Sequence, residues 1–147
     1  MSQLRLGMLV GCTVAVLFAA LVVVRNYRFE AGARALKTGD YATTLRELKP
    51  LARLGDRPSQ YILGEMYAFG FGVRKDDSEA VYWFKRAAIL AQKGVDPAAP
   101  AEFSVSKAYA EGTGVKVDVT ESLKWLQLAA AGGSKEAVAK LAETRSH

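Results

Sequence analysis

Two glycine-containing segments are the first places to look for chemistry in this sequence. They read Tyr-Ala-Phe-Gly-Phe-Gly-Val at Tyr67–Val73 and Tyr-Ala-Glu-Gly-Thr-Gly-Val at Tyr109–Val115. A Gly-x-Gly element is typical of a dinucleotide-binding loop only when it follows a strand, has a third glycine and precedes an acidic residue further on. Neither segment has that context. Because the same element is written twice, the pattern indicates instead a repeat in which glycines end helices.

The polar residues do not form a catalytic or metal-binding set. The only histidine is His147, so we expect no Ser-His-Asp, Cys-His or histidine metal site within one chain. Cys12 is the only cysteine, which leaves no intrachain disulfide and no cysteine metal site. Asp76, Asp77 and Glu79 fit a helix N-terminus, where carboxylates complement the helix dipole. The sequence therefore predicts no enzyme, no cofactor, no metal and no small-molecule substrate.

An uncharged apolar run dominates the N-terminal region. Leu6–Val24 is nineteen residues long, and as a helix it would measure roughly 28 Å, about the thickness of the hydrocarbon core of a bilayer. No small-x-small cleavage site closes the run. We therefore predict an uncleaved transmembrane anchor over residues 1–28, with Arg25 and Arg28 at the membrane interface.

Most of the positive charge belongs to this anchor. The net charge of the chain is +5, and Arg5, Arg25 and Arg28 account for three of those charges, which leaves +2 for residues 29–147. A nearly neutral domain gives no electrostatic reason to expect a nucleic-acid partner.

Landmark residues recur at one constant offset beyond the anchor. The same interval separates Tyr67 from Tyr109, Gly72 from Gly114, and Trp83 from Trp125. Apolar positions at helical spacing precede the glycines, and a second helix with alanines and a tryptophan on one face follows them. Each unit thus reads as a helix hairpin. Candidate N-caps of the second helices are Asp76, Asp77 or Ser78 in the first unit, and Asp118 or Thr120 in the next.

Atypical units flank the two repeats. A helix that begins after Gly39 and ends near Gly55 contains Pro50, which should kink it. After the second repeat, Ser134 caps a short helix that fits the terminal unit an array needs. The stretch 92–100 adds several residues to the repeat, and we read it as a longer second helix and a Pro-bounded loop. The layout of the domain 29–147 is a partial repeat at 29–57, repeats at 58–97 and 98–133, and a capping helix at 134–143.

The repeated pattern has a known counterpart. Ala/Ser-x-Tyr/Phe-x-Leu-Gly-x-x-Tyr-x-x-Gly-x-Gly-Val, followed by Asp, Ala, Trp and Ala-Ala, resembles the Sel1-like repeat family, a relative of the tetratricopeptide repeats. The resemblance covers roughly residues 39–143. The unit at 59–94 matches closely, whereas in the next unit Val105-Ser106 replaces Leu-Gly and Ser122 occupies the small position before the tryptophan. The resemblance implies an all-α fold, a short right-handed α-solenoid of antiparallel helix hairpins, here preceded by one transmembrane helix.

The resemblance also implies a concave partner-binding surface lined by the first helix of each hairpin. Repeat arrays bind through such surfaces, and aromatic residues with a few charges are typical of interface cores. The alternative for Tyr61 and Phe103 is partial burial in the core. The candidate partner-binding residues are Tyr61, Glu65 and Phe69, their counterparts Phe103, Lys107 and Glu111, and Phe71 in the turn.

Two functions are open at this point. The first is a membrane-anchored adaptor that holds a protein partner on its concave surface. The second is an accessory subunit or assembly factor of a larger bacterial inner-membrane complex, in which Gly7, Gly11 and Ala15 let the anchor pack against other helices. We expect a single-pass protein of the bacterial inner membrane. The charge count favours a cytoplasmic domain. Proteins resembling this family are often exported, and on that ground we expect the domain on the periplasmic side.

Overall fold

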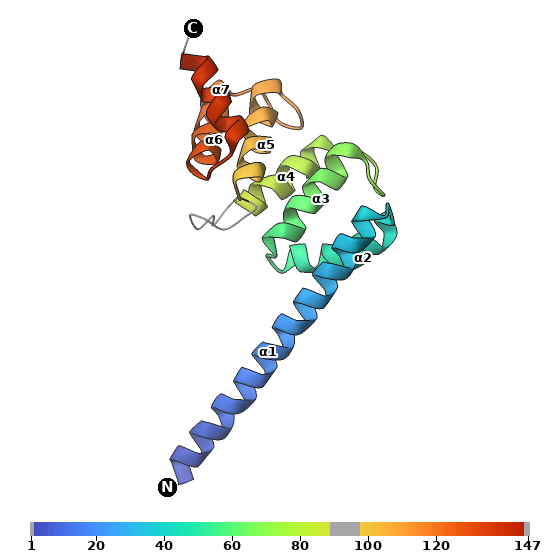
Figure 1. Ribbon diagram of the computed structural model, residues 1–147, viewed down its shortest axis with the longest axis vertical. Coiled ribbons are helices and arrows are strands. Elements are labelled where there is room, and N and C mark those ends of the chain that lie inside the picture. Colours follow the sequence, from blue (N-terminus) through green and yellow to red (C-terminus); the bar gives the residue numbers. More distant parts are fainter. Residues whose placement is uncertain (1, 89–97, 146–147) are drawn as a thin grey trace. The chain divides into compact units, whose positions relative to one another are not determined.

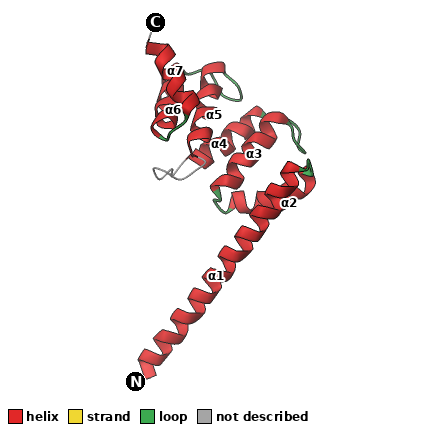
Figure 2. Cartoon of the chain, in the orientation of Figure 1, coloured by secondary structure: helices red, strands yellow, loops and turns green. Residues whose placement is uncertain are grey.

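The chain is built of helices that fall into two units. The computed structural model describes the backbone of residues 2–88 and 98–145 and the side chains of residues 13–88 and 98–144. Every regular element in these ranges is a helix, which confirms the predicted all-α class (Figures 1 and 2). One unit is Met1–Glu47 and the other Leu48–His147. The helices described are α1 (Ser2–Lys37), α2 (Tyr41–Arg53), α3 (Arg57–Phe69), α4 (Asp77–Ala88), α5 (Ala98–Glu111), α6 (Val119–Ala131) and α7 (Lys135–Arg145).

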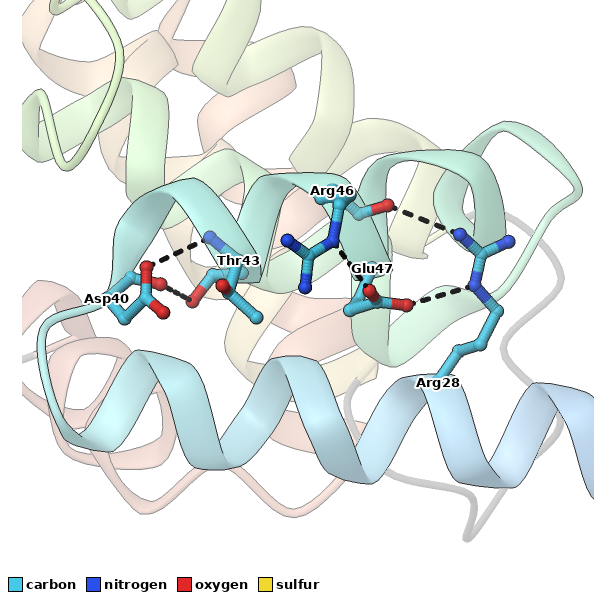
Figure 3. A network of polar contacts seen from close by, with 6 residues as sticks. Arg28, Asp40, Thr43, Arg46 and Glu47 are labelled. Atoms are coloured by element: carbon cyan, nitrogen blue, oxygen red, sulfur yellow. Dashed lines mark hydrogen bonds and ion pairs between the residues drawn. The ribbon is translucent and has the colours of Figure 1, made fainter.

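In the first unit, the end of α1 and the start of α2 form a hairpin. Gly39 adopts a left-handed conformation, with φ at 76°, which lets the chain reverse direction after α1. Asp40 then caps α2, because its carboxylate accepts a hydrogen bond from the backbone N–H of Thr43 at 3.0 Å. Hydrogen bonds donated by the hydroxyl and the backbone of Thr43 hold the pKa of Asp40 below its ordinary value. Arg28 on α1 forms an ion pair with Glu47 on α2 at 3.1 Å (Figure 3).

The N-terminal part of α1 is where the anchor was predicted. Within residues 13–88 and 98–144, no helix combines the length and the apolar character needed to cross a bilayer. Gly7 and Gly11, predicted to pack against other membrane helices, lie outside the residues whose side chains are described. Ala15, the third of that set, is exposed.

The second unit is a solenoid of two helix hairpins and a final helix. Helices α3 and α4 form one hairpin, α5 and α6 the next, while α4 packs on α5 and α7 packs on α6 (Figure 1). The core shared by the two hairpins contains Ala80, Phe84 and Val105, with partly buried aromatic side chains around it. Because alanines such as Ala87 and Ala101 occupy an adjoining buried cluster, the helices can approach closely.

The Gly-x-Gly elements are turns, as the sequence predicted. Gly70 ends α3 in the left-handed conformation, and the backbone N–H of Asp76 donates to the carbonyl of Tyr67 at 3.0 Å. The same bond recurs in the next repeat, from Asp118 to Tyr109, again at 3.0 Å. In each turn, the backbone N–H of the aspartate that caps the second helix is therefore bonded to the carbonyl of the tyrosine before the glycines.

The helix caps resolve the alternatives that the sequence left open. Asp76 caps α4, since its carboxylate accepts from the backbone N–H groups of Ser78 and Glu79, each at 3.0 Å. Asp118 caps α6 through the N–H of Glu121 at 3.0 Å. Ser134, predicted to cap the last helix, accepts from the N–H of Ala137 at 3.2 Å, which confirms that prediction.

The second turn also joins the two hairpins. The Ser78 hydroxyl, at the start of α4, donates to the carbonyl of Gly114 at 3.1 Å. Gly114 has φ at 71°, and a Cβ atom there would overlap the backbone carbonyl of Asp77. Glycine is therefore required at this position both for the turn and for the close approach of two backbones.

The departures of the second repeat from the family pattern compensate one another. In the first repeat, a Cβ atom on Gly64 would lie 2.5 Å from the ring of Phe84, so the ring needs the glycine. The counterparts of these two residues are Ser106 and Leu126. The Ser106 hydroxyl donates to the carbonyl of Ser122 at 2.9 Å, and the Ser122 hydroxyl donates back to the carbonyl of Ser106 at 2.9 Å. A reciprocal hydrogen-bonded pair thus joins α5 and α6 where glycine and a large ring join α3 and α4.

Prolines lie inside α2 and in the first turn of α5. The Pro-bounded loop predicted within 92–100 does not extend to Pro100, because Ala98–Pro100 form the first turn of α5. Proline is tolerated there, since its missing N–H has no helical partner. The rest of that segment lies outside the described residues, which resume at 98. Pro50 lies inside α2, and the helix continues beyond it to Arg53.

Candidate protein-interaction surface

The candidate partner-binding residues on α3 are Tyr61, Glu65 and Phe69. They form a stripe with a buried end and an exposed end. Tyr61 is half-buried, and its ring lies 5.6 Å from that of Phe84, so it contributes to the core between the hairpins. Phe69, two turns further along the helix, is 66% exposed. Phe71, in the turn, is 39% exposed and stacks on Phe69 with 5.5 Å between ring centroids and 29° between planes. The aromatic surface available to a partner is therefore the Phe69/Phe71 pair.

Glu65 lies between the two ends of this stripe. Burial raises the pKa of its carboxyl above the ordinary value, and a hydrogen bond from Tyr61 opposes that shift. The half-buried carboxyl is thus positioned by a core tyrosine on one side, with exposed rings one helical turn away on the other. An acidic group held in this way can accept hydrogen bonds from a docked chain.

The matching positions of the second repeat present a different surface. Phe103 is partly buried and packs against the cluster of Leu126, Ala129 and Ala137 that joins α6 to α7. Lys107 and Glu111 are exposed on α5. The first repeat therefore offers rings, and the second offers charges of both signs.

The residues predicted to lie at the membrane interface have protein contacts in the first unit. Arg25 donates to the side-chain oxygen of Asn26 at 2.9 Å and lies 5.2 Å from the ring centre of Phe29. Arg28, besides its ion pair with Glu47, donates to the backbone carbonyl of Arg46 at 3.4 Å (Figure 3). The hydrogen bonds from Arg46 and Arg28 hold the pKa of Glu47 below its ordinary value.

A cavity of about 520 Å³ lies in the second unit, at a place that the sequence did not indicate. It collects side chains from the end of α2, the end of α3 and one face of α4. In the sequence, Tyr67 and Trp83 are landmarks of the repeat, and nothing relates them to the basic residues of α2. The lining residues are Lys49, Arg53, Tyr67, Glu79, Tyr82, Trp83 and Arg86.

Over the described ranges, no group of three or more His, Cys, Asp or Glu side chains is placed to hold a metal ion.

Comparison with known proteins decides the family. The profile of the Sel1 repeat matches residues 57–91 and 99–134, the two hairpins α3–α4 and α5–α6. The crystal structure of a Sel1 repeat protein from Oxalobacter formigenes is 31% identical, over 81% of this chain and 88% of that one, with a TM-score of 0.70. The chain belongs to the Sel1 repeat family.

Further similar proteins include some that are longer than this chain. A protective antigen of uropathogenic Escherichia coli strains with an SLR fold is 34% identical over 77% of this chain and 24% of its own, with a TM-score of 0.68. An exopolysaccharide production negative regulator of Rhizobium leguminosarum bv. viciae is 37% identical over 71 residues, or 48% of this chain. The chain spans about a quarter of the length of the curated relatives it matches. The part shared with those relatives thus has the length of a pair of Sel1 repeats.

Proposed function

We propose that this Sel1 repeat protein is a protein–protein interaction scaffold that holds a partner on the Phe69/Phe71 pair. The observation that carries the proposal is the exposure of two stacked aromatic rings on the first hairpin. Exposed aromatic side chains on a rigid scaffold are typical anchors of protein interfaces, because they bury a large apolar area at a small entropic cost. Glu65, one helical turn before Phe69, supplies a hydrogen-bond acceptor. No catalytic role is proposed for any residue.

In-cell photo-crosslinking tests this function. A photoreactive phenylalanine analogue at position 69 or 71 is expected to give a discrete crosslinked protein. The matched control is position 119, where Val119 is even more exposed but lies on α6. The same products from positions 69 and 119, or none from either, would contradict the proposal. Phe69→Ala together with Phe71→Ala should abolish capture by a probe placed at position 107.

The scaffold is further proposed to be tethered to the bacterial inner membrane by α1. The argument is the pattern of exposure along the helix, since apolar side chains on every face are between 42% and 68% exposed. A helix that is apolar all round has no single face to place against a core, and a bilayer would cover all of its faces. These side chains are Val14, Val16, Leu17, Phe18, Leu21, Val22, Val23 and Val24.

Membrane attachment and the side of the repeats are tested separately. Resistance to alkaline carbonate extraction, lost in a Leu17→Arg/Leu21→Arg variant, would support the tether, and release of the unaltered protein would contradict it. For the side, Val138→Cys adds an exposed thiol on α7 in a chain whose only other cysteine is Cys12. Labelling of intact cells with a maleimide that cannot cross the inner membrane is expected if the repeats are periplasmic.

The second candidate function is that of an accessory subunit or assembly factor of a larger inner-membrane complex. The stripe Gly7, Gly11 and Ala15 favours it, because small residues four apart permit close helix contact in a membrane. Replacement of all three by leucine distinguishes the two functions. Loss of co-purifying membrane subunits would favour the accessory subunit, and their retention would favour the simple tether.

A further inference from the structure

The cavity described above is lined by an excess of positive charge. Lys49, Arg53 and Arg86 face a single acid, Glu79. Neither Lys49 nor Arg53 forms an ion pair among the described residues. The lining therefore has a formal net charge of +2, three basic residues against one acid, and an anionic group entering it would meet cations that protein acids do not neutralise.

One of these cations is held in place by the wall of the cavity. The guanidinium of Arg86 donates to the hydroxyl of Tyr82 at 3.0 Å and lies 5.7 and 5.8 Å from the ring centres of Tyr82 and Trp83. A guanidinium fixed against two rings loses little freedom when it binds a planar group of two oxygens, for which its fork of N–H donors is suited.

The wall also contains hydrogen-bond donors without acceptors. Trp83 is 6% exposed, and its indole N–H has no hydrogen-bond partner among the described residues. The hydroxyl of Tyr109, the counterpart of Tyr67, accepts from Lys85 at 2.7 Å. No such bond is formed by the Tyr67 hydroxyl within the described part of the chain. The indole N–H is itself enclosed, so the Tyr67 hydroxyl is the donor that favours a ligand with acceptor oxygens.

The cavity is a property of the first repeat and not of the repeat scaffold. Tyr67, Glu79 and Trp83 recur at the corresponding positions of the second repeat as the same residue types. The two residues that build the fixed cation, Tyr82 and Arg86, are replaced there by Lys124 and Leu128. Packing of a Sel1 hairpin therefore does not require them.

We propose that this cavity binds carboxylate side chains of an acidic segment of a partner protein. Arg86 would pair with one carboxylate, Arg53 and Lys49 would neutralise it or a neighbour, and the Tyr67 hydroxyl would donate to a remaining oxygen. The volume of about 520 Å³ accommodates one or two side chains of such a segment. A nucleic acid is disfavoured as ligand, because the net charge of residues 29–147 is only +2 and the cations are local to one cavity. The inference rests on the proposed scaffold function and adds a second contact to it.

Trp83 provides the readout of the test. The chain has two tryptophans, so in a Trp125→Phe background of the full-length protein in mild detergent the fluorescence reports the cavity. Titration with a hexaglutamate peptide is expected to change this fluorescence. Arg53→Gln and Lys49→Gln should each weaken binding about tenfold, the effect of losing one charged contact. Arg74→Gln is the matched control, because it removes one positive charge from an exposed position outside the cavity. It should change the affinity for the peptide by less than about twofold, as expected of a surface charge.

Each contrary result is distinct. Equal weakening by Arg53→Gln and Arg74→Gln would show general electrostatic attraction and overturn the cavity. Binding of glutarate as tight as that of the peptide would assign a free dicarboxylate instead of a protein segment, and tighter binding of inorganic phosphate would assign a phosphate site. No response to any of the three probes would also overturn the proposal. A partner that crosslinks at position 69 independently of Arg53 would overturn the cavity contact and leave the scaffold function intact.

Discussion

Replacing Gly114 by alanine should destabilise the repeat domain more than any ordinary turn substitution. Two costs combine at this position. The left-handed backbone, with φ at 71°, costs an alanine about 1–2 kcal/mol. The added Cβ atom would also overlap the backbone of Asp77, and a backbone cannot rotate away as a side chain can.

The second cost can be worked from the contacts at the junction. To admit the methyl group, the turn must move away from the start of α4, which breaks the hydrogen bond from Ser78 to Gly114 and loosens the packing around it. Loss of the hydrogen bond is worth about 1 kcal/mol, and overpacking adds about 1–3 kcal/mol. We therefore expect a loss of about 3–6 kcal/mol in the free energy of unfolding.

Gly133→Ala is the matched control. Gly133 also has a left-handed backbone, with φ at 95°, but a Cβ atom there meets nothing within 4 Å. Gly133→Ala should lower the free energy of unfolding only by the conformational cost, about 1–2 kcal/mol. Urea denaturation followed by circular dichroism at 222 nm measures both variants on the full chain. Equal losses for the two glycines would refute the reasoning, because they would show that the approach of the two backbones carries no energetic weight.

Three further predictions concern the second repeat and the half-buried acid. Leu126→Phe should cost about 1–3 kcal/mol by overpacking, and Ser106→Gly in the same chain should recover part of that loss, because it recreates the pairing of Gly64 with Phe84; a double-mutant cycle without coupling would contradict this. Asp118→Ala removes the cap of α6 and should cost about 1 kcal/mol in urea denaturation, whereas Asp118→Asn should cost little. Glu65→Gln should raise the free energy of unfolding at neutral pH, because burial raises the pKa of Glu65 in the folded state and its charged form therefore opposes folding. The advantage of Glu65→Gln should shrink as pH falls through the raised pKa and vanish below the ordinary value of 4.5, and an advantage that stays constant down to pH 3 would exclude the carboxyl as its cause.

The sequence was sufficient for features that depend on neighbours along the chain. The left-handed glycines, the cap at Ser134 and the order of the hairpins follow from residue types a few positions apart, because turns and caps are local structures. The constant offset between the repeats then related the two hairpins without any structural information.

Features that depend on contacts between helices were beyond that reasoning. Sequence spacing put Tyr61 and Phe69 on one stripe, but only the position of Phe84 shows that Tyr61 is in the core. In the sequence, Ser106 and Ser122 are two separate departures from the repeat pattern. Only the arrangement of α5 and α6 shows that they bond to each other. The cavity could not be foreseen for the same reason, since its cations come from different helices and no spacing along the chain relates them.

The junction at Gly114 has a consequence for how such a protein can change over generations. The junction requires a glycine in the turn of one repeat and a hydroxyl at the start of the second helix of the repeat before it. The second repeat already has such a hydroxyl, that of Thr120. A repeat added by tandem duplication could therefore pack against the existing one through the same junction. Residues such as Tyr82 and Arg86 take no part in this junction. Each copy can therefore acquire a different recognition surface while the packing of one repeat on the next is preserved.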